Sequence, residues 1–187
     1  MRIIAGTARG RRFDAPKGMD TRPTLDRVKE SVFGMLQFDI PGSSVLDLFS
    51  GSGNLGLEAA SRGAKTVVCN DRSRDCAEQI EKNAALLGLS DVVRTLCMDY
   101  AACIGRLKGE GATFDFVFLD APYRDGTARS AAEAVVSEGL LKPGGRIVVE
   151  HAANLPPQVS QRLATCIETR QYGSCAVSFY RRASDEA

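Results

Sequence analysis

A glycine-rich loop between a buried strand and a helix is the feature that most restricts how this 187-residue chain can fold. The stretch "VLDLFSGSGNLGLEAA", residues 45–60, contains Gly51, Gly53 and Gly56 in the spacing G-x-G-x-x-G. This spacing lets the backbone approach a ligand closely and lets the following helix pack tightly on the strand. The loop therefore predicts a site for an adenosine-containing cofactor, carried by alternating strands and helices.

Strand and helix patterns alternate along the rest of the chain. We expect short buried strands at 44–49, 64–71, 92–99, 114–120 and 144–151, with helices between them. Ser73 and Gly88 are the residue types that begin and end a helix, which predicts a helix over 74–88. Residues 164–182 predict two strands joined near Tyr172 and Gly173. The pattern indicates a doubly wound, mostly parallel α/β sheet with ligands at the carboxyl ends of its strands.

The first 40 residues differ in charge from the remainder. Residues 1–12 contain four arginines and no acid, although the whole chain has a net charge of only +1. "MRIIA" and "GRRFDA" predict a small hairpin, and residues 25–38 predict a helix with one apolar face. We therefore expect a basic extension over 1–40 and a cofactor-binding domain over 41–183. A basic arm is typical of a nucleic-acid contact, and the alternative is a solvated, charged hairpin.

Composition argues against a secreted disulfide scaffold and against a membrane protein. The six cysteines form no C-x-x-C pair and most fall in apolar runs, so we expect buried, reduced thiols in a cytoplasmic protein, with no metal site. No apolar run is as long as a membrane span, and the N-terminus lacks the apolar core of a secretory signal.

Two carboxylates indicate which cofactor the glycine loop fits. Asp47 lies inside the strand before the loop, where its charge would repel a pyrophosphate but attract the sulfonium and ammonium groups of S-adenosylmethionine. Asp71 ends the next strand and can accept both ribose hydroxyls of an adenosine cofactor of either kind. We therefore favour S-adenosylmethionine over a nicotinamide dinucleotide. The alternative for Asp47 is a buried structural acid, which needs a hydrogen-bond partner.

The stretch "FVFLDAPYRDG" after the fourth expected strand predicts chemistry on an amine. Asp120 and the backbone carbonyl of Ala121 can accept both hydrogens of an exocyclic amine, which directs the nitrogen lone pair toward a methyl group. Pro122 would stiffen the turn, and Tyr123 would stack on the base. The alternative is an ordinary turn with a half-buried tyrosine. No general base is evident, and we interpret the single histidine, His151, as structural or close to RNA rather than as that base.

Together these segments resemble the RsmD family of bacterial methyltransferases, which modify the exocyclic N2 amine of a guanine in 16S ribosomal RNA. The resemblance covers nearly the whole chain and includes "MRIIAG", "RGRR", "DLFSGSGNLGLEAASRGA", "GLLKPGGRIVVEH" and, most specifically, "RPTLDRVKESVFGML" at 22–36. It implies a Rossmann-like class I methyltransferase domain over 41–183, whose seven-stranded sheet ends in an antiparallel hairpin. This sequence has D-A-P-Y where the family usually has D-P-P-Y, which keeps the carbonyl acceptor but puts the rigidity of the loop in doubt.

The motifs and the resemblance together give a set of expected site residues. The cofactor would contact Asp47, Phe49, Ser50, Gly51, Gly53, Asn54, Asp71, Arg72, Asp99 and Tyr100. Asp99 would accept from the adenine amine beside Met98 or Tyr100, or would cap the following helix, and the two roles can coexist. The amine would be held by Asp120, Ala121, Pro122 and Tyr123. RNA phosphates would be bound by Arg9, Arg11, Arg12, Arg22, Arg27 and Arg124.

The sequence thus predicts a cytoplasmic, monomeric enzyme that transfers a methyl group from S-adenosylmethionine to guanine N2 of 16S rRNA, in a 30S subunit or an assembly intermediate. Other acceptors stay open, such as adenine in DNA, another RNA or a protein glutamine. A nicotinamide-dependent oxidoreductase would use the glycines but leave Asp47 and the tetrapeptide without a role. A non-catalytic RNA-binding assembly factor is a further alternative, for which Ala121 would be an early sign.

Overall fold

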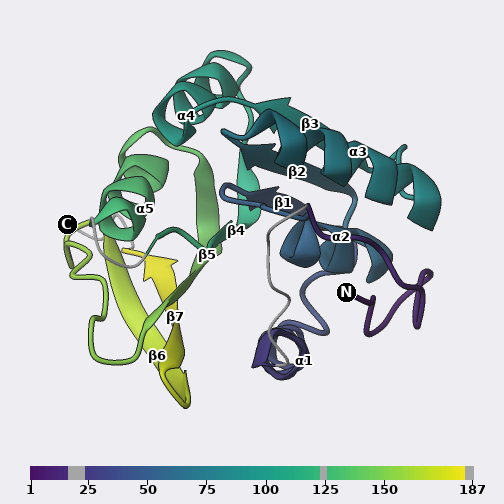
Figure 1. Ribbon diagram of the computed structural model, residues 1–187. Helices are drawn as coiled ribbons and strands as arrows, with labels where there is room; N and C mark the ends of the chain where they lie inside the picture. The colour runs from purple at the N-terminus through teal and green to yellow at the C-terminus, as the bar shows by residue number, and fades with distance from the viewer. Residues whose placement is uncertain (17–23, 123–125, 184–187) are drawn as a thin grey trace. The chain divides into compact units, whose positions relative to one another are not determined.

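The computed structural model describes residues 1–16, 24–122 and 126–183. Within these residues the elements in chain order are α1 (Thr24–Met35), β1 (Ser44–Asp47), α2 (Asn54–Ser61), β2 (Thr66–Asp71), α3 (Arg74–Leu87), β3 (Val93–Cys97), α4 (Tyr100–Gly109), β4 (Phe114–Leu119), α5 (Thr127–Ser137), β5 (Leu141–Ala152), β6 (Ala164–Tyr172) and β7 (Cys175–Arg182). The strands form a seven-stranded, mostly parallel sheet with an antiparallel C-terminal hairpin, which confirms the predicted fold class (Figure 1).

The chain forms two compact units, Met1–Asp99 and Tyr100–Ala187. In the first unit β3, β2 and β1 pair in parallel, with Asp47 opposite Cys69. In the second unit β4 pairs in parallel with β5, and β5, β7 and β6 then pair in antiparallel order. The expected boundary between residues 1–40 and 41–183 differs from the boundary between these two units, and the expected division stays a prediction.

The helix α3 begins and ends where its capping residues predict. Ser73 has an extended conformation, and its Oγ accepts a hydrogen bond from the Cys76 N–H. Gly88 follows the last turn with φ 72°, and its N–H donates to the Ala84 and Ala85 carbonyls. Ile80 and Leu87 are buried on the inner face. Because both caps act through neighbouring residues alone, the sequence is sufficient to define this element.

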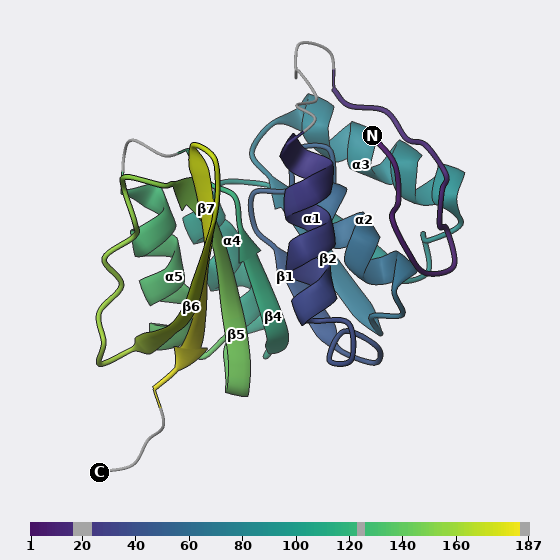
Figure 2. The same ribbon diagram turned by 90° about the horizontal axis from the view of Figure 1, so that it is seen from below.

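The predicted N-terminal hairpin is only partly formed. A single antiparallel bridge joins Arg2 and Arg12, and no strand is assigned within residues 1–16, which we call the N-terminal arm. Many of the arm's backbone groups bind α2 instead: the Thr7 N–H donates to the Ser61 carbonyl at 2.8 Å, and the Ile4 N–H donates to Glu58 Oε2 at 2.9 Å. Figure 2 shows the arm running past α2 and α3. The arm thus keeps backbone hydrogen bonds between its two halves, such as the Ile3 N–H to the Arg11 carbonyl at 3.0 Å, while other backbone groups bind α2.

The helix α1 is shorter than its apolar pattern predicts. It ends at Met35, and Phe38, which was expected inside the helix, is 89% exposed in the turn that follows. The expected apolar face is confirmed at Val28, Val32 and Phe33, which are all buried.

The cysteines depart in part from the expectation of buried thiols. All six are free, and Cys69, Cys76 and Cys103 are buried as expected. Cys97 and Cys166 are exposed, so for them the expectation was wrong. Both belong to outer strands, β3 and β6, where alternate side chains face solvent although the local sequence is apolar. Among the described helices, none is both long enough and apolar enough to cross a membrane.

Candidate functional site

Asp47 ends β1 and lies fully buried beneath the glycine loop, 1% exposed. Its Oδ2 accepts a hydrogen bond from the Gly56 N–H at 2.9 Å, while Oδ1 has no hydrogen-bond partner among the described residues. Desolvation raises the pKa of Asp47 to about 7, and the Gly56 N–H and the Ser50 hydroxyl offset only part of that shift. This geometry is that of a structural acid under α2, because the oxygen without a partner is itself buried.

The glycine loop needs its glycines for two different reasons. Gly53 has φ 83°, in the left-handed region that side chains with a Cβ disfavour, and it precedes the first residue of α2. Gly56 lies inside α2, where a Cβ would overlap Cys69 Sγ of β2 and lie 3.3 Å from Asp47 Oδ2. Gly53 shapes the turn, and Gly56 allows the helix to contact two strands closely.

Asp71 connects the end of β2 to the same loop. Its Oδ2 accepts the Gly51 N–H at 2.9 Å, and its Oδ1 accepts the Ser73 N–H at 2.8 Å. The side chain is half-buried, and each carboxylate oxygen can still accept a second hydrogen bond. Asp71 can therefore hold the loop in place and bind ribose hydroxyls at once.

Asn70 is a residue of this region that the sequence reasoning missed. It is 1% exposed, and its Nδ2 donates to the Leu48 and Met98 carbonyls, each at 3.1 Å. The side chain thereby ties together the segments that follow β1 and β3, while its Oδ1 has no partner within the described chain. The sequence signal that could have identified Asn70 is its position beside Asp71 at the end of β2.

Asn54, expected to contact cofactor, is the half-buried first residue of α2. Its Oδ1 accepts a hydrogen bond from Lys29 Nζ at 2.8 Å. Sequence reasoning missed Lys29 and its partner Glu58, which form a buried ion pair with N–O 3.3 Å. Burial lowers the pKa of Lys29, and the Glu58 carboxylate counteracts that shift. The signal was an acid in the apolar run "LGLEAA", since buried carboxylates require partners.

The other expected cofactor residues differ in exposure. Ser50 is buried and its Oγ donates to the Asp47 carbonyl at 2.7 Å, whereas Phe49 is half-buried. Arg72 and Asp99 are exposed, and Asp99 directly precedes α4, so it has the position of a helix cap as well. Tyr100 begins α4, in the second unit.

The tetrapeptide follows β4 in the second unit. Asp120 is exposed, Ala121 is buried and Pro122 is exposed, while Tyr123 and Arg124 lie outside the described residues. Sequence reasoning missed Cys175 and Glu150 as neighbours of Asp120. Burial raises the pKa of the Cys175 thiol, and the carboxylates of Glu150 and Asp120 raise this pKa further.

His151 has the surroundings of a structural residue. It is 3% exposed, with Nε2 2.8 Å from Ser178 Oγ and Nδ1 2.9 Å from the Ala152 carbonyl. Both ring nitrogens are therefore engaged inside the second unit, which argues against a role as a base.

The arginines expected to bind RNA fall into three groups. Arg9 and Arg12 of the arm and Arg27 of α1 are exposed. Arg11 instead donates from Nη1 to the Leu87 carbonyl at 3.0 Å and from Nη2 to the Leu86 carbonyl, at the end of α3. Arg22 and Arg124 lie outside the described residues. Arg11 thus has a capping role that its neighbours in the arm lack.

We expect Asp47→Asn to remove a pH dependence from the free energy of unfolding. The folded-state pKa of about 7 exceeds the ordinary value of 3.8. The contribution of Asp47 to the free energy of unfolding is therefore complete below pH 3.8 and is lost as pH rises through about 7. Relative to the variant, the wild type should lose on the order of 2–4 kcal/mol between pH 4 and 8. Urea unfolding at several pH values measures this difference, with the exposed Asp91→Asn as control. Parallel pH profiles would contradict the assignment.

Comparisons with known proteins agree with this fold. The model of the family described as "Conserved hypothetical protein 95" matches residues 1–181. "Ribosomal RNA small subunit methyltransferase D" of Haemophilus influenzae is 37% identical over 160 residues, which cover 83% of this chain and 81% of that protein. The protein of the same name from Escherichia coli K12 is 36% identical over 80% of this chain and 74% of its own length. The solved structure of Escherichia coli yhhF is 31% identical, covers 97% of each chain and has a TM-score of 0.85.

Proposed function

The chain belongs to the RsmD family, which the matching model describes as "Conserved hypothetical protein 95", and from this membership we propose that it methylates ribosomal RNA. We further propose that the donor is S-adenosylmethionine and that the acceptor is the exocyclic N2 amine of a guanine in 16S rRNA. The substrate is the RNA of a 30S subunit or assembly intermediate, and the enzyme acts as a cytoplasmic monomer. The names of the two curated relatives support a small-subunit rRNA substrate.

The observation that best supports the donor is the pair of acids around the glycine loop. Asp47 beneath the loop and Asp71 bonded to the Gly51 N–H give this loop a negative environment. A pyrophosphate would bring two negative charges close to the Asp71 carboxylate, whereas a ligand with a sulfonium, an ammonium and two ribose hydroxyls is suited to that side of the loop. The remaining lone pairs of the half-buried Asp71 are acceptors for such a ligand.

In this proposal different groups of the chain bind the cofactor and the acceptor amine. When bound, the cofactor would supply an electrophilic methyl group and would leave as S-adenosylhomocysteine. Asp71 would accept the ribose hydroxyls, and the loop after β1 would hold the methionine moiety. In the second unit Asp120 and the carbonyl of Ala121 accept the two amine hydrogens, which localises the nitrogen lone pair for attack. After transfer the nitrogen is acidic, and Asp120 or solvent takes its proton.

Calorimetry with S-adenosylhomocysteine and with NAD tests the donor. We expect the first to bind and NAD to bind weakly or not at all, because the loop carries two acids. Asp71→Ala should weaken S-adenosylhomocysteine binding by about 1.5–3 kcal/mol, the value of hydrogen bonds to a charged group. Tight NAD binding would instead support the oxidoreductase alternative, and an unchanged affinity in Asp71→Ala would reassign the ribose contact.

The arm arginines provide a test of the polymer substrate. We expect Arg9→Gln with Arg12→Gln to weaken rRNA binding and to flatten the slope of log K against log salt by about 1.4–1.8, or 0.7–0.9 per lost phosphate contact. Compared with the Arg9 and Arg12 variant, Arg11→Gln should change the slope less and lower the thermal midpoint more. The reason is that the Arg11 guanidinium donates hydrogen bonds to carbonyls of α3.

Arg74→Gln is the matched control, because this arginine is exposed on α3 and pairs with Glu78. Filter binding over a salt series measures the slopes, and S-adenosylhomocysteine affinity should be the same in all variants. An unchanged slope in the arm variant would mean that the arm is solvated and does not bind phosphate.

A further inference from the structure

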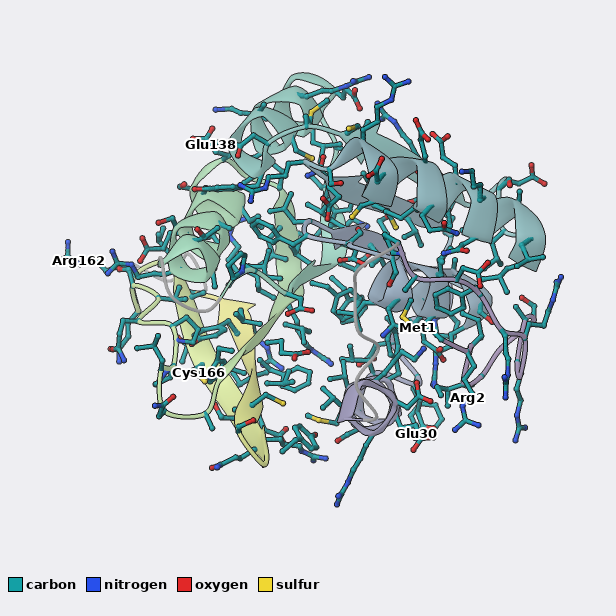
Figure 3. All side chains as sticks on the ribbon, viewed as in Figure 1. Met1, Arg2, Glu30, Glu138, Arg162 and Cys166 are labelled. Atoms are coloured by element: carbon teal, nitrogen blue, oxygen red, sulfur yellow. The ribbon has the colours of Figure 1, made fainter. Side chains whose placement is uncertain are left out.

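A buried lysine lies behind the first turn of α2, and the proposed reaction does not use it. Lys29 of α1 is 1% exposed. Its Nζ donates to the Arg2 carbonyl at 2.6 Å and to Asn54 Oδ1 at 2.8 Å, and it lies 3.3 Å from Glu58 Oε2. An ammonium has three donors, so all of them are used. Figure 3 labels Arg2 of the arm and Glu30, the residue next to Lys29 on α1.

Glu58 is held independently of Lys29. It accepts hydrogen bonds from the Ile4 N–H at 2.9 Å and the Ala5 N–H at 3.1 Å, and Arg62 Nε donates to it at 2.7 Å. The carboxylate therefore keeps three partners when the lysine is replaced. Glu58 also neutralises Lys29, so the lysine is poorly placed to act on a ligand directly, and its effect must pass through Asn54.

Lys29 determines which way the Asn54 amide faces. An ammonium can only donate, so the oxygen of the amide must face Lys29 and the Nδ2 group must face away. In the part of the chain that the structure describes, Nδ2 donates to no other group. A half-buried NH2 group with a fixed orientation is thus available directly after Gly53, at the loop that we propose holds the cofactor.

We propose that Lys29 is a positioning residue for cofactor binding, which holds Asn54 so that its Nδ2 donates to the carboxylate of the methionine moiety. This inference rests on the proposed cofactor. The carboxylate is the only anionic group of S-adenosylmethionine, and the first turn of a helix favours an anion. A donor NH2 suits that group, whereas the opposite amide orientation would present an oxygen and repel it.

Two ligands separate this role from a general effect on folding. S-adenosylhomocysteine carries the amino acid moiety with its carboxylate, and 5′-methylthioadenosine lacks it. We expect Lys29→Met to weaken S-adenosylhomocysteine binding roughly tenfold to a hundredfold, the value of one hydrogen bond to a charged acceptor. The affinity for 5′-methylthioadenosine should change less than about twofold by the same reasoning, because that ligand never makes the bond.

Variants of Asn54 complete the test. Asn54→Ala should reproduce the selective loss, and combining it with Lys29→Met should add little, because both remove the same interaction. Asn54→Asp should keep the thermal midpoint, since a carboxylate still accepts from Lys29. It should nevertheless lose S-adenosylhomocysteine affinity at least as strongly as Asn54→Ala, because it presents an oxygen to the ligand's carboxylate.

The outcomes separate this inference from the proposed function. Equal losses for both ligands in Lys29→Met, or full S-adenosylhomocysteine affinity in Asn54→Asp, would overturn the positioning role. If Lys29→Met does not fold, Asn54→Asp and Asn54→Ala decide the question. A wild type that binds neither ligand would overturn the role together with the proposed donor. Selective losses as expected, in a protein that labels no RNA, would support the role and contradict only the proposed function.

Discussion

Asp120→Ala is expected to lower the rate of methyl transfer at least about a hundredfold, while the affinity for S-adenosylhomocysteine stays within about twofold of wild type. The reason is that Asp120 is assigned to the amine and not to the adenosine. An acceptor that orients the nitrogen lone pair acts mainly in the transition state, so its loss should reduce the rate constant and leave cofactor binding intact. Single-turnover labelling of RNA together with calorimetry measures both quantities.

Asp115→Ala is the matched control for Asp120. Asp115 belongs to the same strand, β4, and its Oδ2 accepts from Lys142 Nζ at 2.7 Å. This surface ion pair should matter little for stability and not at all for turnover. Retention of more than about a tenth of wild-type turnover in Asp120→Ala would contradict the assigned role, as the expected loss is about a hundredfold or more.

Gly56→Ala is expected to cause a large loss of stability in the first unit. Its Cβ would overlap Cys69 Sγ and would lie 3.3 Å from both Asp47 Oδ2 and Val67 Cγ1. Because the inner face of α2 contacts β1 and β2 directly, the helix must shift, which would strain the Gly56 N–H bond to Asp47. We expect a loss of about 2–4 kcal/mol in the free energy of unfolding, the range for severe overpacking.

Two further variants show whether the overlap is the cause. Gly105→Ala in α4 has open space around its Cβ, so it should be neutral or stabilise by up to about 1 kcal/mol. Adding Cys69→Ala to Gly56→Ala removes the overlapping sulfur and should restore part of the lost stability. Urea unfolding measures all of these values. Gly56→Ala within about 1 kcal/mol of wild type would contradict the packing described for this helix.

Local signals were sufficient for several elements. Ser73 and Gly88 delimit α3, and the turn at Gly173 joins the C-terminal hairpin, because these residues act on their immediate neighbours. The N-terminal hairpin formed only in part for the opposite reason. The backbone of the arm binds Ser61 and Glu58, which lie more than fifty positions away in sequence, and no pattern within the arm predicts that competition.

The candidate site was predictable where its chemistry lies at strand ends. The positions of Asp47, Asp71 and Asp120 at strand ends were predicted because a parallel sheet collects ligand-binding groups there, and their roles stay predictions. The depth of burial of Asp47, and hence its raised pKa, depends on the packing of α2, which sequence alone does not describe. Lys29 and Asn70 were missed for a related reason, since a buried polar side chain is recognisable only with the partners that satisfy it.

The central claim, that this chain transfers a methyl group to guanine N2 of 16S rRNA, is tested most directly by nucleoside analysis of RNA labelled in vitro. Wild type and Asp120→Ala are incubated with tritiated S-adenosylmethionine and either naked rRNA or immature 30S particles, and the RNA is then digested to nucleosides. We expect the label in N2-methylguanosine from the wild-type reaction and almost none from Asp120→Ala. Label in a methylated adenosine or cytidine, label in protein or DNA only, or no label in either RNA would contradict the claim.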